Sequence, residues 1–259
     1  DVERHIRYQH KVVAANWSSS EKRWLVTAER GGSGDGSGES VTISCKFIFN
    51  CSGYYDYEQG YIPEFAGIDN FNGQVLHPQH WPENLDYHDK RVVVIGSGAT
   101  AVTLVPAMSK DTASLVMLQR TPTYIASIPA EDPMAETLGK WLPDNWVFRL
   151  IRWKKVLFQI YIYNLSRKKP RQLRRYLIGQ VRKALGPDYD VATHFTPDYN
   201  PWDQRLCAVP DGDLFAAIRA GNAEVVTDHI DQFNGDGIQL KSGKQLDADI
   251  VILATGLNL

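Results

Sequence analysis

Residues 91–101 join an apolar run to a glycine-rich turn and the start of a helix-like stretch. The run, RVVVI, is followed by six small residues: Gly96, Ser97, Gly98, Ala99, Thr100 and Ala101. In a dinucleotide-binding turn with this GxGxxG/A spacing, the first glycine permits a tight turn, the second lets the backbone approach a pyrophosphate, and a small third residue allows close helix packing. The helix N-terminus adds unpaired N–H groups and the positive end of a dipole. The spacing therefore predicts a dinucleotide phosphate site, against the alternative of a glycine turn in another α/β protein.

The end of the next strand, which we expect at residues 114–118, indicates which nicotinamide cofactor would bind. An NAD site has an Asp or Glu about 20 residues beyond the glycines to accept from the ribose 2′-hydroxyl, whereas a nearby arginine accommodates a 2′-phosphate. Here the strand ends in Gln119-Arg120-Thr121, without an acid. We therefore predict NADP, held by Arg120 and Thr121; a surface arginine without a ligand is the alternative.

Two more polar residues that could reach a site are Asp203 and Arg205. They lie in residues 194–206, HFTPDYNPWDQRL, which we expect to form a loop because of its prolines and aromatics. Without further information, a surface ion pair is the favoured interpretation of both residues.

The composition is that of an ordinary globular protein. Of the 259 residues, 43% are apolar and 22% charged, and the net charge of -2 argues against general nucleic-acid binding. Three cysteines (Cys45, Cys51 and Cys207) without a CxxC pair predict neither a metal site nor a redox disulfide and suit a reducing compartment. Since there is no signal peptide and no apolar run of the ~18 residues that a membrane span needs, we expect a cytoplasmic protein.

The strand pattern predicts an α/β protein with two similar parts. We expect strands at residues 6–15 and 24–29 and one longer strand or two at 41–50, with GGSGDGSGES (31–40) as a flexible hairpin connection. Near the C-terminus, a tight hairpin at 237–244 precedes an apolar strand at 248–254. Each part ends in a Ser/Thr-Gly pair, Ser52-Gly53 and Thr255-Gly256. This repetition suggests two related nucleotide-binding domains, and coincidence between two short hairpins is the alternative.

Residues from about 130 to 200 read as a helical insertion. Six residues follow helical spacing and are expected to form a buried stripe: Trp146, Leu150, Trp153, Leu157, Ile160 and Asn164. Further helices are expected from about Pro170 to Gly186 and at 213–220, the latter followed by a strand at 223–227. Twelve Lys and Arg and no acid stand between Asn145 and Pro187. We expect the aromatic side chains to pack on the protein, with peripheral contact between residues 145–185 and a membrane as the alternative.

Residues 54–90 contain a further spaced pattern. Prolines at 63, 78 and 82 prevent one regular element. The pattern FxGxxxHxxxWP is formed by Phe71, Gly73, His77, Trp81 and Pro82. Any one of these is most simply a loop residue, so only the combination is informative.

This pattern resembles the fingerprint of Baeyer-Villiger monooxygenases, the class B flavoprotein monooxygenases, and every defined position matches. The resemblance extends over the GSGATA turn, the LQRTP after the second strand, the YNPWDQR loop and the terminal ATG. It therefore covers nearly the whole chain. GSGATAVTLVPA and YNPWDQRLC make the chain most similar to the mycobacterial ethionamide-activating monooxygenase group.

The resemblance implies an enzyme in which NADPH reduces FAD, the reduced flavin captures O2, and one oxygen atom is inserted into a ketone or transferred to sulfur. Ketones would give esters or lactones. It also implies that Arg205 is the active-site arginine, whose fixed charge would stabilise developing negative charge. His77 and Trp81 match linker positions that would couple domain movement to cofactor binding, without proton transfer at His77.

The chain departs from the family pattern at both ends. An FAD fingerprint would precede residue 1, and the chain stops just after ATG. We therefore expect a fragment, inactive alone, with most of the FAD site outside it. The expected parts are an FAD-domain β-meander at 1–55, an interdomain linker at 56–90, and a Rossmann-like NADP-binding domain at 91–259 with the helical insertion.

Two other functions stay open. A pyridine-nucleotide disulfide reductase would share the two dinucleotide domains, but it needs a redox cysteine pair, and Cys45 and Cys51 have the wrong spacing. A non-catalytic nucleotide-binding module is not excluded by the sequence.

Overall fold

The first of two units is an antiparallel meander. The computed structural model describes residues 2–31 and 38–258, and the chain divides into residues 1–54 and 55–259. The meander has the order β1-β2-β3. Its elements are a 3-10 turn η1 (Glu3–His5) and the strands β1 (His10–Ser18), β2 (Arg23–Arg30) and β3 (Glu39–Cys45). The predicted glycine-rich connection falls mostly on residues 32–37, outside the described residues.

Two strand boundaries differ from expectation. β1 begins at His10 and not at residue 6, and β3 ends at Cys45 although a strand was expected up to Asn50. The strand prediction for 46–50 was wrong: Phe47 and Phe49 stand 75% and 81% exposed there. This segment has strand-like residues but no paired strand in the described part of the chain, and an extended backbone is stable in a sheet only when its N–H and C=O groups are paired.

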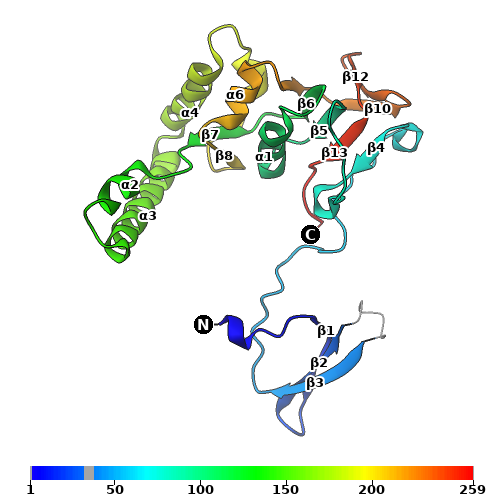
Figure 1. Ribbon diagram of the computed structural model, residues 1–259, viewed down its shortest axis with the longest axis vertical. Helices are drawn as coiled ribbons and strands as arrows, with labels where there is room; N and C mark the ends of the chain where they lie inside the picture. The colour runs from blue at the N-terminus through cyan, green and yellow to red at the C-terminus, as the bar shows by residue number, and fades with distance from the viewer. Residues whose placement is uncertain (1, 32–37, 259) are drawn as a thin grey trace. The chain divides into compact units, whose positions relative to one another are not determined.

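A five-stranded parallel sheet lies at the centre of the second unit, in the order β4-β13-β5-β6-β9 (Figure 1). Its strands are β4 (Gln74–Leu76), β5 (Arg91–Ile95), β6 (Ser114–Gln119), β9 (Glu224–Thr227) and β13 (Ile250–Leu253). The chain runs from β5 to β6 and β9 on one side and returns to β13 on the other. The strand order therefore reverses between β5 and β13, which is where open α/β sheets bind ligands. The predicted α/β class with a parallel sheet is confirmed.

Both faces of this sheet are covered, which explains the unbroken apolar run of β5. Val92 and Val94 face a core shared with helices, whereas Val93 and Ile95 face a core shared with a second meander. The helices are α1 (Ala99–Met108), α4 (Pro170–Leu185), α5 (Val191–Phe195) and α6 (Asp213–Arg219). The meander strands are β10 (Ile230–Asn234), β11 (Gly237–Leu240) and β12 (Gln245–Asp247). Successive strand side chains alternate between faces, so burial on both sides requires apolar residues throughout.

The chain leaves the central sheet after β6. It forms β7 (Tyr124–Ile128), which pairs in parallel with β8 (Leu206–Pro210), and neither strand was predicted. Between them lie α2 (Pro133–Gly139) and α3 (Asp144–Lys168), followed by α4 and α5. Figure 1 shows α2 and α3 as an arm that extends away from the parallel sheet.

The two long helices were predicted correctly, but the side of α3 that is buried was predicted wrongly. On α4 the expected residues Leu173, Leu177 and Val181 are buried. On α3 the predicted stripe is exposed, so the expectation that it packs on the protein was wrong: its apolar members are 43% to 65% exposed, and the helix instead buries Val147 and Ile151. Helical spacing identifies an apolar face, but it does not show that a neighbour covers that face. Within the described ranges, no helix has both the length and the apolarity needed to cross a bilayer.

Candidate functional site

The glycine turn fits closely against the end of β13. Gly96 has φ +136, and a Cβ built on it would collide with the carbonyl oxygen of Ala254. Its N–H donates to the carbonyl of Leu118 at 2.8 Å. Glycine is therefore required at position 96 both by backbone conformation and by contact with the neighbouring strand.

The start of α1 is open to an anion. Gly98 is the N-cap residue, no side chain caps the helix, and the first turn holds no acid. The first helical backbone bond runs from Val102 to the carbonyl of Gly98 at 3.1 Å, so the preceding N–H groups have no helical acceptor. Ala101 is fully buried in the core under the helix. The turn thus combines close packing with unpaired donors, as a phosphate site requires.

The side chain of Ser97 is used inside the protein. Its hydroxyl lies 2.9 Å from the hydroxyl of Thr123 and donates to the carbonyl of Thr121 at 3.4 Å. Ser97 is buried. It holds the segment after β6 against the glycine turn, so its contribution to a nucleotide site would come from its backbone.

Arg120 and Thr121 are exposed at the carboxyl end of β6. In the part of the chain that the structure describes, the guanidinium of Arg120 makes no hydrogen bond or ion pair. Gln119, in contrast, is buried and donates to the carbonyl of His194 at 2.7 Å and to Thr227 at 2.8 Å. The amide of Gln119 therefore fixes the strand end, and Arg120 projects from it.

Arg205 lies beside the glycine turn although more than one hundred residues separate them. A Cβ built on Gly98 would lie 3.3 Å from Nη1 of Arg205. The backbone of Arg205 is positioned by Tyr199, whose hydroxyl donates to its carbonyl at 3.0 Å. Tyr124 in turn donates to the carbonyl of Tyr199 at 2.7 Å, and burial raises the pKa of both phenols. The tyrosine pair keeps its protons as donors and so supports the position of Arg205.

The expected ion pair of Asp203 involves a different arginine. Asp203 contacts Arg167 of α3 at 2.7 Å and accepts from Asn200 at 3.1 Å. The hydrogen bond from Arg167 is the main cause that lowers the pKa of Asp203. Among the described residues, the guanidinium of Arg205 has no such partner, so its charge is available to a ligand.

A cleft of about 440 Å³ connects these residues at the carboxyl edge of the sheet. Gly96, Ser97, Arg120, Thr121 and Arg205 line it. Several other lining residues were not predicted from the sequence, among them Tyr61, Glu64, Lys241 and Thr255. Lys241 is exposed on the turn after β11, and only the packing of the meander on the sheet brings it near Arg120, so no local sequence signal could have identified it.

The FxGxxxHxxxWP residues fold against the ends of β13. Phe71 is buried and packs against Phe233, with ring centroids 6.2 Å apart. A Cβ on Gly73 would collide with the carbonyl oxygen of Asp249, just before β13. His77 is buried and contacts the carbonyl of Gly256, just after β13. Trp81 stands 37% exposed, and Pro82 is half-buried.

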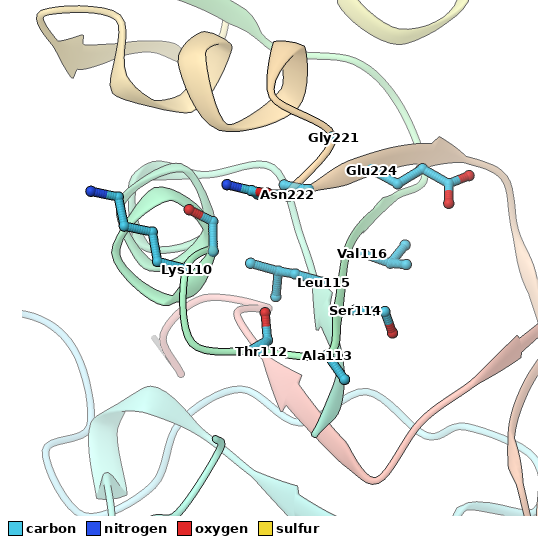
Figure 2. A pocket seen from close by; sticks show the side chains of 11 residues that line it. Lys110, Thr112, Ala113, Ser114, Leu115, Val116, Gly221, Asn222 and Glu224 are labelled. Carbon is cyan, nitrogen blue, oxygen red and sulfur yellow. The ribbon is translucent and has the colours of Figure 1, made fainter. Parts of the chain in front are cut away.

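A second cavity lies at the opposite edge of the sheet. It has a volume of about 380 Å³ and is lined by the turn before β6 and the start of β9, including Lys110, Ser114, Asn222 and Glu224 (Figure 2). It contains none of the predicted site residues, and Glu224 is paired with Lys244 at 2.7 Å. Since ligands of open α/β sheets bind outside the carboxyl ends of the strands, we place the candidate site at the other edge.

Cysteines and metal-binding groups do not form a second kind of site in the described residues. Cys45, Cys51 and Cys207 are free thiols, and burial raises the pKa of Cys207. Within residues 2–31 and 38–258, no group of three His, Cys, Asp or Glu could hold a metal ion. The disulfide reductase alternative gains no support from these thiols.

Comparisons of the sequence with known proteins point to the family that its motifs resemble. All of residues 1–259 match the flavin-binding monooxygenase-like family. The chain is 53% identical over 259 residues to the FAD-containing monooxygenase EthA of Mycobacterium tuberculosis, covering 100% of the chain and 52% of EthA. It is 52% identical over 260 residues to the probable FAD-binding monooxygenase AlmA of Acinetobacter baylyi, covering 100% of the chain and 51% of AlmA. The chain thus spans about half the length of these relatives.

Solved structures support the fold. An oxidized steroid monooxygenase bound to NADP matches with a TM-score of 0.73 at 24% identity, covering 99% of the chain and 53% of that structure. An open structure of cyclohexanone monooxygenase matches with a TM-score of 0.71 at 19% identity, covering 99% of the chain and 55% of that structure.

Proposed function

The chain belongs to the flavin-binding monooxygenase-like family, and we propose that it carries the NADPH-binding site of a Baeyer-Villiger-type monooxygenase. The observation that carries the proposal is the cleft in which the glycine turn, Arg120 and Arg205 lie together. Because the chain spans about half the length of its relatives, nucleotide binding is proposed for the chain itself. Oxygen insertion into a ketone, or oxygen transfer to sulfur, is proposed for a protein of the relatives' length. We propose that this chain alone does not convert substrate.

The described residues fit a dinucleotide phosphate. Gly96 and Gly98 bring the backbone to the edge of the cleft, and the uncapped N–H groups of Ala99 and Thr100 would donate to the pyrophosphate. Arg120 would hold the 2′-phosphate through charge-assisted hydrogen bonds, with Thr121 beside it. When bound, NADPH supplies a hydride; the protein contributes binding and orientation.

FAD is the second cofactor that we propose. It is supported by EthA, named as FAD-containing, and by neighbours solved with FAD and NADP. The meander of residues 1–55 would belong to the FAD-binding domain, residues 56–90 would form the linker, and residues 91–259 the NADP-binding domain. Arg205 would face the reacting atoms from the NADP side and place a fixed positive charge there, which stabilises developing negative charge and takes no proton.

Calorimetry with NADP and NAD tests nucleotide binding by this chain. We expect NADP to bind about tenfold more tightly, because a 2′-phosphate gains a charge-assisted contact with Arg120. Arg120→Ala should reduce that preference and leave NAD binding unchanged. Arg7→Ala, which removes an exposed arginine of the first unit, is the matched control. Equal affinities for the two nucleotides, or an unchanged preference in Arg120→Ala, would contradict the proposal.

A further inference from the structure

The largest feature that the nucleotide site leaves unexplained is an apolar stripe on α3. We call it the α3 stripe, and it consists of Trp146, Leu150, Trp153, Leu157 and Ile160, which are 59%, 43%, 65%, 61% and 52% exposed. These residues repeat at the helical spacing that keeps them on one side, over about 21 Å of helix. Large apolar side chains that are exposed together on one helix face mark an interaction site.

Another side of α3, about a third of a turn away from the α3 stripe, is used by the protein. Val147 and Ile151 are buried, and Lys154 contacts Asp132 of the segment before α2 at 2.8 Å. Since successive residues are rotated by about 100° around a helix, Val147 and Ile151 point well away from the α3 stripe. The stripe therefore lies on a side of the helix that the described residues leave exposed.

Arginines border the α3 stripe. The guanidinium of Arg149 lies 6.0 Å from the centre of the Trp146 ring. Arg149 and Arg152 line an open hollow together with Trp153. From Asn145 to Pro187 the chain carries twelve basic residues and no acidic one. The surface thus presents tryptophan rings and aliphatic side chains next to guanidinium groups, with no acid from this stretch to repel an anion.

We propose that the α3 stripe docks on the surface of an anionic lipid bilayer, with α3 lying in the interface plane. The apolar side chains would enter the boundary of the acyl chains, and Arg149 and Arg152 would contact lipid phosphates. Tryptophan favours this boundary because its ring is apolar and its N–H is polar. The proposal does not depend on the nucleotide site.

Charge favours a bilayer over a second copy of the chain as the occupant. A symmetric contact between two α3 stripes would bring the basic residues that border one stripe near those of the other, and residues 145–187 hold no acid to pair with them. Like charges at a desolvated contact destabilise it, whereas anionic headgroups neutralise the same basic residues.

Flotation of the purified chain with vesicles tests the proposal. We expect binding to phosphatidylcholine vesicles that contain phosphatidylglycerol, weaker binding to phosphatidylcholine alone, and weakening by salt. Arg149→Gln with Arg152→Gln should reduce the affinity for mixed vesicles about thirtyfold. Trp153→Ser with Leu157→Ser should reduce binding to both kinds of vesicle about tenfold or more. Circular dichroism checks that each variant remains folded, as expected for exposed positions.

Matched controls come from exposed residues of the first unit. Arg7→Gln with Lys46→Gln removes the same charge, and Phe47→Ser removes an aromatic side chain that is 75% exposed. Both should bind vesicles as the parent does. Equal losses in control and α3 variants would overturn the proposal, as would equal binding to neutral and anionic vesicles. A third outcome would also overturn the proposal: the chain self-associates, Trp153→Ser abolishes this self-association, and no vesicle binding is seen. The surface would then dock a second copy of the chain.

Discussion

The imidazole of His77 joins the segment before β5 to the segment after β13. Its Nδ1 accepts from the N–H of Gln79 at 3.2 Å, so Nε2 carries the proton and donates to the carbonyl of Gly256 at 3.0 Å. Both ring nitrogens are therefore occupied by backbone groups. We therefore propose that His77 positions the segment around Gly256 and transfers no proton.

His77→Ala should destabilise the chain, because it removes one of the two donors to the Gly256 carbonyl, the other being the N–H of Tyr61, and opens a cavity beside Gly60. We expect a loss of about 2 kcal/mol in the free energy of unfolding, measured with urea. His80→Ala is the control, since its ring also contacts a backbone carbonyl, that of Glu58, but on the exposed surface. Equal effects of the two changes would show that His77 is an ordinary surface contact.

Gly96→Ala should be far more harmful than an alanine in an open helix. The φ of +136 and the collision with Ala254 require backbone movement, and we expect a loss of about 3 kcal/mol or a failure to fold. Gly179→Ala is the counterpart, because nothing lies within 4 Å of a Cβ there and alanine favours the helix by about 0.5–1 kcal/mol. Thermal unfolding should therefore shift in opposite directions. Two similar shifts would contradict the close approach at Gly96.

The sequence predicted secondary structure and burial correctly where the apolar residues of a local pattern are the ones that the fold buries. The run 92–95 and its glycines predicted a strand, a turn and a helix, and β5 and α1 confirm these elements. On α4 the same periodicity predicted both the helix and its buried side. The meander at 230–247 was anticipated in part from its hairpin, and all these features depend on neighbours that are close in the chain.

Features that depend on distant partners were missed. Tyr124 pairs with Leu206, 82 positions later in the chain, and no pattern in either segment indicates the other. For the same reason Lys241 was not connected with Arg120, and the α3 stripe was assigned to the interior. The segment around Phe47 carries a strand pattern without a paired strand in the described residues, so β propensity alone did not form one.

The ion pair of Arg91 and Asp249 should make the chain lose stability in acid. Hydrogen bonds from the side chain and backbone of Arg91 lower the pKa of Asp249 to about 2. Since this folded-state pKa lies below the unfolded value, the stabilisation is complete above about pH 4 and is lost as the pH falls through about 2. Asp249→Asn should therefore reduce stability at neutral pH and flatten its decline in acid, whereas Asp231→Asn should do neither. An unchanged pH profile in Asp249→Asn would contradict this assignment.

Lys241 should contribute to the preference for NADP over NAD. It lines the same cleft as Arg120, and its ammonium makes no ion pair with the described residues. A second cation near a 2′-phosphate strengthens the contact, although solvent screens it, so Lys241→Ala should weaken NADP binding about fivefold and spare NAD. Lys244→Ala is the matched control. Lys244 lies on the same turn as Lys241, but its ammonium is paired with Glu224 of β9. Calorimetry that finds equal losses for both nucleotides would remove Lys241 from the 2′-phosphate site.

Arg205 should be needed for oxygen transfer and not for nucleotide binding. A chimera in which this chain replaces the matching half of EthA from Mycobacterium tuberculosis provides the missing length, since the two are 53% identical over 259 residues. In this chimera Arg205→Ala should lower the rate of oxygenated product formation about a hundredfold or more, because a fixed charge beside the reacting atoms is lost. Arg205→Lys should restore only part of the rate, since an ammonium lacks the planar fork of a guanidinium. NADPH affinity should stay within about twofold of the parent chimera. Retained product formation in Arg205→Ala would remove this residue from the active site, and a parallel loss of NADPH affinity would assign it to the phosphate contact beside Gly98.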